Sequence, residues 1–318
     1  NRLNSITVGL NTSSYSYDAS GNQTQENSSR FFEWNFGNQM RCFYNQAGTA
    51  EPTIYAQYLY DGTGNRVKKI VRTQGGGYES ISYIGGTFEY KTNGTDEQTT
   101  VYIMDGNSRI AMTRKGFDFG DTTPVVKYNL EDHLNSSTVL LETNGALINK
   151  EEYYPFGETS FGSYAKKRYR FSGKERDQES GLYYYGARYY MPWACKFITC
   201  DPLSGELPHW SSYVGFNDNP IRYIDPTGMK GDDWIATTSM INGVEHHTWK
   251  WVPESYGSLG EAQSANSSYS HWMGKGGVIP EIHKSNGYVG PVTLLDGGGH
   301  IEGSHPDKLT GEANSGSG

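Results

Sequence analysis

The 318-residue chain lacks the features that mark membrane proteins, helical proteins and nucleic-acid-binding proteins. It contains no run of about 18 apolar residues, so no hydrophobic helix is predicted to span a bilayer. Its 35 acidic residues outnumber its 27 basic ones and give a net charge of −8. This balance argues against nucleic acid or an anionic membrane as the main partner. Helical periodicity is scarce, which argues against a helical fold.

Cysteine is also scarce. The three cysteines, Cys42, Cys195 and Cys200, are too few for a disulfide framework. Cys195 and Cys200 lie near each other in the sequence, yet we expect buried free thiols rather than a disulfide. Two of the three have no histidine at zinc-ligand spacing. The sequence therefore predicts no metal site and no cofactor.

Glycine and tyrosine are abundant instead. The chain has 40 Gly and 25 Tyr, aromatic residues make up 14%, and the mean hydropathy is −0.69. Tyrosine favours strands and combines an apolar ring with a polar tip, whereas glycine suits tight turns. We therefore predict an all-β fold of many short strands. The first residues, "NRLNSITVGLNTSSYSYD", lack a signal-peptide pattern and begin within a strand-like stretch, so we interpret the chain as a fragment of a longer protein.

Two stretches repeat one frame, Y-x-Y-D-x-x-G-N. Residues 15–22 read "YSYDASGN" and residues 58–65 read "YLYDGTGN". In each, alternating tyrosines lead into a turn whose Asp can accept bonds from its own backbone and whose Gly can take a positive φ. Strand-like residues follow both turns, so the pattern predicts consecutive β-hairpins. "TNGT" and "MDGNS" are further hairpin turns, and "LNSSTVLLE" is compatible with a strand or a short helix.

The composition changes after residue 229. Residues 230–318 lose the Tyr-Asp turns and carry five Lys against ten Asp and Glu, a balance of −5. They also hold six of the eight histidines, and their spacing fits no metal or catalytic motif. We place a domain boundary directly after "DPTGM".

Several further motifs occur in a fixed order along the chain. They are "YNLEDHLNSS", "YYPFGE", "YRFSGKERDQESGLYYYGARYYMPWACKFITCDP" and "NPIRYIDPTGM". With the Tyr-Asp turns, they resemble the C-terminal end of an Rhs/YD-repeat protein and its repeat-associated core domain. The same architecture is found in the C subunits of insecticidal toxin complexes, in polymorphic Rhs toxins and in teneurins. The resemblance covers residues 1–229, and in this setting we expect His133 to be a buried packing and hydrogen-bonding residue of the sheet.

The resemblance implies three segments. Residues 1–165 would be YD-repeat hairpins that form part of a spiralling β-sheet shell. Residues 166–229 would be the core domain, a plug that closes the shell. Residues 230–318 would be a variable, effector-like segment of uncertain fold.

The resemblance also implies an activity, because the core of the toxin members is an aspartyl autoprotease. Self-cleavage would fall between Met229 and Lys230, with Asp201, Asp225 and Arg188 as the functional residues. Two neighbouring carboxyl groups in a water-poor pocket can divide into an acid and a base, and an arginine can hold one of them ionised. The simpler interpretation is that both Asp-Pro pairs form turns and that Arg188 stacks on tyrosines.

Partners and location also come from the resemblance. We expect the remainder of the shell or a toxin-complex B-type subunit as partner, and residues 230–318 as enclosed cargo. The protein would be secreted or displayed on a cell surface through a bacterial export or injection system. One alternative is a non-catalytic structural or adhesive YD-repeat protein. Another, with little support in the sequence, is a hydrolase whose site lies in residues 230–318.

Overall fold

The computed structural model describes residues 1–106, 108–162, 167–206, 211–221 and 223–229, together with short strands between residues 233 and 311. The chain divides into two compact units. The first comprises residues 1–221 and 227–229, and the second residues 222–226 and 230–318. Among the described residues, strands dominate the chain, which confirms the all-β prediction.

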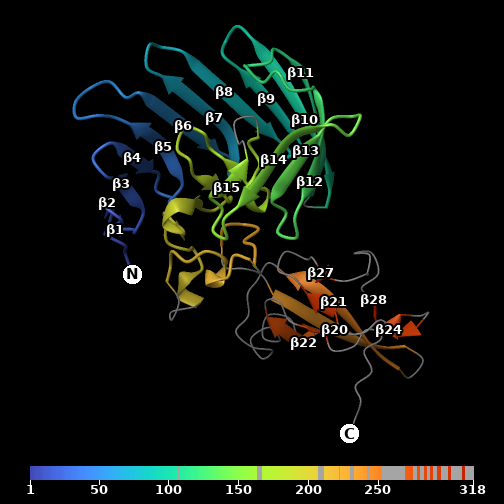
Figure 1. The fold of residues 1–318 in the computed structure, drawn as a ribbon. Helices are drawn as coiled ribbons and strands as arrows, with labels where there is room; N and C mark the ends of the chain where they lie inside the picture. Colours follow the sequence, from blue (N-terminus) through green and yellow to red (C-terminus); the bar gives the residue numbers. More distant parts are fainter. Residues whose placement is uncertain are drawn as a thin grey trace. The chain divides into compact units, whose positions relative to one another are not determined.

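One antiparallel sheet of fifteen strands forms most of the first unit. Every strand pairs with the next one along the chain, so the order in the sheet is the order in the sequence. Figure 1 shows this sheet as a curved, open surface that runs from blue to yellow-green. The strands are β1 (Ser5–Val8), β2 (Asn11–Tyr17), β3 (Gln23–Glu26), β4 (Arg30–Trp34), β5 (Met40–Asn45), β6 (Ile54–Tyr60), β7 (Arg66–Thr73), β8 (Tyr78–Ile84), β9 (Phe88–Thr92), β10 (Glu97–Asp105), β11 (Ser108–Gly116), β12 (Val126–Glu131), β13 (Ser137–Leu141), β14 (Leu147–Tyr153) and β15 (Thr159–Gly162).

The two repeated frames form the hairpin turns that the sequence predicts. In the turn between β6 and β7, Asp61 Oδ1 accepts hydrogen bonds from the backbone N–H groups of Thr63 and Asn65, both at 2.9 Å. Gly64 has a φ of +91°, a conformation that glycine adopts without steric cost. Asp18 makes the equivalent bond in the turn between β2 and β3. The stretch "LNSSTVLLE", for which two interpretations were open, contains strand β13.

A smaller sheet lies after the first in the chain. Its four antiparallel strands are β16 (Glu175–Arg176), β17 (Tyr183–Tyr184), β18 (Tyr189–Met191) and β19 (Lys196–Phe197). Four single-turn 3₁₀ helices accompany it: η1 (Phe171–Gly173), η2 (Pro192–Ala194), η3 (Ser204–Glu206) and η4 (Phe216–Asp218).

The small sheet packs on the large one through apolar and aromatic side chains. From the small sheet and its connections, Leu182, Tyr189, Met191 and Ile198 are buried with side chains of β2 and β4–β6 in one core. Alternate side chains of a strand point to one face, so the i and i+2 tyrosines of each repeated frame both face this core. The tyrosine-rich block of residues 183–190 is thus packing material, as its composition suggests.

The second unit is also built from strands, and only their bounds are described. Four strands form a sheet in the order β22-β20-β21-β28, three form β23-β26-β27, and two form β24-β25. The bounds are β20 (Asp233–Ile241), β21 (Val244–Val252), β22 (Tyr269–Gly274), β23 (Val278–Ile279), β24 (His283–Lys284), β25 (Gly287–Tyr288), β26 (Val292–Leu294), β27 (His300–Ile301) and β28 (Thr310–Gly311). Among the described residues, no helix is long and apolar enough to cross a membrane.

Two expectations about single residues are wrong. All three cysteines are free, but Cys195 is exposed and Cys200 half-buried, so only Cys42 is a buried thiol. His133 is exposed in the turn after β12 rather than buried in the sheet, although it does form a hydrogen bond, with its Nε2 3.1 Å from the carbonyl oxygen of Ile221.

Candidate functional site

Arg188 is the centre of the candidate site. It ends the tight turn between β17 and β18, where the Tyr185 N–H donates to the Arg188 carbonyl at 3.0 Å. Its side chain is only 2% exposed, and the guanidinium carbon lies 3.7 Å from the centroid of the Phe197 ring. A buried guanidinium needs acceptors for its N–H groups, because leaving a charge unpaired in the interior is costly.

Asp201 supplies the charged partner. Arg188 Nη2 lies 2.9 Å from Asp201 Oδ2, and the Asp201 side chain is 11% exposed. Arg188 Nη1 also donates to the Ser212 carbonyl at 3.4 Å. The structure therefore brings together two of the three predicted catalytic residues.

Asp201 also builds a turn. Its Oδ1 accepts a bond from the Leu203 N–H at 2.9 Å, and its carbonyl accepts one from the Ser204 N–H at 3.0 Å. The turn interpretation of this Asp-Pro pair is therefore right in part. One carboxylate oxygen serves the turn and the other faces Arg188, so the two interpretations do not compete.

The "DPTG" segment contacts the same turn through its backbone. The Thr227 carbonyl accepts a hydrogen bond from the Ala187 N–H at 2.9 Å, and the Gly228 carbonyl accepts one from Arg188 Nε. A Cβ atom on Gly228 would lie 3.0 Å from the Arg188 backbone nitrogen, and one on Gly186 would lie 2.9 Å from the Thr227 oxygen. Both glycines also have positive φ, at +75° and +96°. Glycine is needed at both positions for the two backbones to approach this closely.

The remaining predicted residues flank this contact. Met229, directly after Gly228, is exposed. Asp225 is a buried carboxyl group, 4% exposed, and belongs to the second unit, so its pairing with Asp201 stays a prediction. Lys230 lies outside the described residues.

Sequence reasoning missed three contributors to the site. The ring of Phe197, the carbonyl of Ser212 and the glycine of the "GARYY" motif all contact or position Arg188 or the "DPTG" segment. Only Gly186 has a signal in the sequence, since a glycine between two strand-like tyrosine runs indicates a tight turn. In the part of the chain described, no three His, Cys, Asp or Glu side chains are grouped so as to hold a metal ion.

Comparisons with known proteins show that the chain is similar to parts of much longer proteins, toxin subunits among them. It is 30% identical over 244 residues to toxin subunit YenC1 of Yersinia entomophaga, which covers 71% of this chain and 25% of the relative. It is 26% identical over 284 residues to the tRNA nuclease WapA of Bacillus subtilis, covering 85% of this chain and 11% of the relative. No protein-family profile matches the chain.

Solved structures agree with these sequences. The crystal structure of TcdB2–TccC3 superposes with a TM-score of 0.60 at 27% identity, over 67% of this chain and 11% of that one. The Tc holotoxin pore of Photorhabdus luminescens gives the same TM-score at 26% identity, over 67% of this chain and 10% of that one. The chain thus spans about a quarter or less of the relatives and structures it matches.

Proposed function

Because the chain is an Rhs/YD-repeat protein, similar to the C subunits of toxin complexes, we propose that it forms the closing end of a hollow β-sheet shell. The shell encloses residues 230–318 as an effector, and the chain releases this segment by cutting itself once between Met229 and Lys230. The observation that carries the proposal is the contact of Arg188 with both Asp201 and the Gly228 carbonyl.

Arg188 holds the chain directly before the proposed cut. Its Nε binds the carbonyl one residue before Met229, which fixes the path of the backbone that leads into the bond to be broken. The same guanidinium keeps Asp201 beside that backbone. Because the bond to be cut is in the same chain, the fold positions it and no separate substrate has to bind. A single turnover is sufficient to release the segment.

The two aspartates take complementary roles. Asp201 faces the Arg188 cation and suits the base that removes a proton from water. Asp225, a buried carboxyl group four residues before Met229, takes the role of the acid. The water oxygen bonds to the Met229 carbonyl carbon, the bond to the Lys230 nitrogen breaks, and Asp225 gives that nitrogen its proton.

Intact-mass measurement of freshly purified protein tests this function. Wild-type protein should give two pieces, residues 1–229 and 230–318, whereas Asp201→Asn and Asp225→Asn should each give one uncut chain. Asp105→Asn is the matched control, because Asp105 is exposed at the end of β10 and should leave cleavage unchanged. Cleavage of Asp201→Asn at the wild-type rate would refute the proposal.

Partners and location follow from the relatives. We infer that the chain joins the remainder of a shell, on the same chain or in a B-type subunit, and that this assembly is exported or injected. The solved TcdB2–TccC3 complex supports the B-type partner. Co-purification of a longer YD-repeat chain with this one would test the assembly.

A non-catalytic structural or adhesive role is the second candidate. Exposed large apolar side chains on the fifteen-stranded sheet support it, including Leu59 on β6, Val101 and Ile103 on β10, and Leu130 on β12. An adhesive fibre would stay uncut and leave residues 230–318 open to added protease. A shell would protect that segment.

A further inference from the structure

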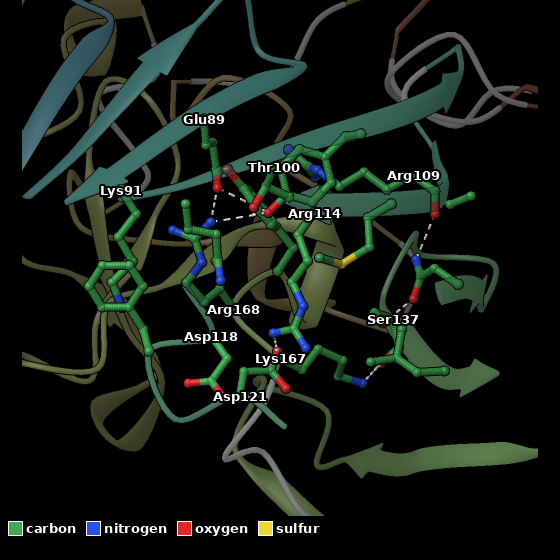
Figure 2. Close-up of a pocket in the computed structure, with 18 of the residues that line it drawn as sticks. Glu89, Lys91, Thr100, Arg109, Arg114, Asp118, Asp121, Ser137, Lys167 and Arg168 are labelled. Atoms are coloured by element: carbon green, nitrogen blue, oxygen red, sulfur yellow. Dashed lines mark hydrogen bonds and ion pairs between the residues drawn. The ribbon is translucent and has the colours of Figure 1, made fainter. Parts of the chain in front are cut away.

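A cavity of about 330 Å³ lies in the first unit, against side chains of β9–β13. Its wall combines side chains of these strands with residues 118–121 and with residues 167–169, which lead into the small sheet. Figure 2 shows Thr100, Arg114 and Arg168 lying around the same space. The volume is at the lower end of the range for small-molecule sites, about 300–1,000 Å³.

The lining is aromatic and, on balance, basic. Three rings contribute, those of Tyr102, Phe119 and Tyr169. Five basic side chains line the cavity against three acidic ones, an excess of two positive charges. The basic residues are Lys91, Arg109, Arg114, Lys167 and Arg168, and the acidic ones are Glu89, Asp118 and Asp121.

Four of these cations already have carboxylate partners. Lys91 Nζ lies 2.8 Å from Glu79, Arg114 pairs with Asp121 at 2.6 Å, and Lys167 pairs with Glu151 at 3.1 Å. Arg168 pairs with Glu89 and Glu175. These cations therefore have little unbalanced charge to offer a ligand.

Arg109 differs from the other four. It has no carboxylate within ion-pair distance among the described residues, and its one side-chain hydrogen bond there runs from Nη1 to the Gly173 carbonyl at 2.7 Å. Its guanidinium carbon lies 3.5 Å from the centroid of the Tyr169 ring and 5.5 Å from that of Tyr102. Its Nε is buried without a hydrogen-bond partner. Stacking on tyrosine fixes the orientation of the planar guanidinium group. Its N–H groups then lie in a fixed arrangement that suits an anionic group.

We propose that this cavity binds a small planar organic anion, with the acidic group on Arg109 and the flat apolar part among Tyr102, Phe119 and Tyr169. A cavity of about 330 Å³ is within the range of small-molecule sites and suits a ligand of one ring and one acidic group. Carboxylates and phosphate monoesters share this chemistry. The site is separate from Arg188 and Asp201 and does not depend on self-cleavage.

Calorimetric titration of the uncut Asp201→Asn protein tests the proposal. The probes are benzoate, phenyl phosphate, inorganic phosphate and benzyl alcohol. We expect benzoate or phenyl phosphate to bind more tightly than inorganic phosphate and benzyl alcohol, because both the ring and the charge contribute. Preference between the first two identifies the acidic group.

Three variants complete the experiment. Arg109→Met should weaken binding by about tenfold or more, the usual effect of losing a charge-assisted hydrogen bond. Ala111→Leu fills the cavity from a buried position without removing a charge, and should also abolish binding. Arg41→Met removes an exposed arginine far from the cavity lining and should change nothing.

Each result decides the proposal. Binding that Arg109→Met and Ala111→Leu both weaken supports it. The proposal is overturned if no probe binds at millimolar concentration, if inorganic phosphate binds as well as phenyl phosphate, or if Ala111→Leu, correctly folded by circular dichroism, binds like its parent. Because the tested protein is already uncut, failure here leaves the self-cleavage proposal intact.

Discussion

A buried cluster of charges joins the small sheet to the large one, and Asp177→Asn is the sharpest test of its contribution. Arg66 and Lys69 extend from β7, and each lies 2.7 Å from one carboxylate oxygen of Asp177. Arg66 also pairs with Glu175 at 2.7 Å. All four side chains are at most 6% exposed. Asp177 therefore shares with Glu175 and Glu179, which lie 3.1 and 3.5 Å from Lys69, the balancing of two cations that water does not reach.

The expected magnitude follows from this burial. Removing one partner of a buried ion pair leaves an uncompensated charge and costs about 3–5 kcal/mol, whereas an exposed pair contributes about 0–1 kcal/mol. We expect Asp177→Asn to lower the free energy of unfolding by about 3 kcal/mol, the lower end of this range, because Glu175 and Glu179 still pair with Arg66 or Lys69. Glu33→Gln is the matched control, since Glu33 pairs with Arg41 at the surface, where the two side chains are 39% and 64% exposed. It should cost less than about 1 kcal/mol.

Urea unfolding followed by tryptophan fluorescence measures both values, with the slope against urea as a check on two-state behaviour. The proposed mechanism predicts that the Asp201→Asn background keeps the chain in one piece. A loss for Asp177→Asn within about 1 kcal/mol of the Glu33→Gln loss would refute the reasoning, because it would mean that Glu175, Glu179 or water balances Arg66 and Lys69 without Asp177.

Three further outcomes are expected. Burial lowers the pKa of Lys196 to about 8, whereas its value in the unfolded chain is about 10.5, so the unfolded state binds the proton at a higher pH than the folded state. Compared with Lys196→Met, the stability of the wild-type protein should therefore fall as the pH drops from about 10.5 to 8 and then level off. The urea midpoints of the two proteins measure this difference. Gly228→Ala should slow self-cleavage strongly, because the added Cβ would lie 3.0 Å from the Arg188 backbone nitrogen, and its circular dichroism spectrum should be unchanged. Cleavage at the wild-type rate in a time course followed by mass spectrometry would contradict this. Leu182→Ala should cost about 2–5 kcal/mol in urea, since Leu182 is fully buried in the core, and a cost under about 1 kcal/mol would disprove that packing.

Local features of the fold were predictable because they depend on neighbouring residues. The turn at residues 61–65 needs an acceptor at Asp61 and a positive φ at Gly64, and both requirements are visible in eight letters of sequence. Each hairpin then fixes the pairing of its own two strands. Because every strand of the large sheet pairs with the next strand along the chain, local patterns are sufficient to predict all of its pairings.

The contacts between the two sheets were not predictable in this way. Arg66 and Asp177 are separated by 111 positions, and nothing in either segment identifies the other as its partner. Cys195 was expected to be buried because free thiols usually are, but Cys195 follows η2 directly in a left-handed conformation and is exposed. Arg188 and Asp201 were found through a family resemblance, whereas the ring of Phe197 beneath Arg188 appears only in three dimensions.

The geometry of the candidate site depends on the large sheet. Arg188 ends the turn that leads into β18, and β18 places Tyr189 and Met191 in the shared core. Tyr189 also shares a 3.0 Å hydrogen bond with Tyr60, at the end of β6. The turn that contacts the Gly228 carbonyl is thus held by packing against hairpins more than a hundred residues earlier in the chain. Self-cleavage should therefore require the docked small sheet, so a change in the core of β6, such as Tyr58→Ala, should slow the cut without touching Arg188, Asp201 or Gly228.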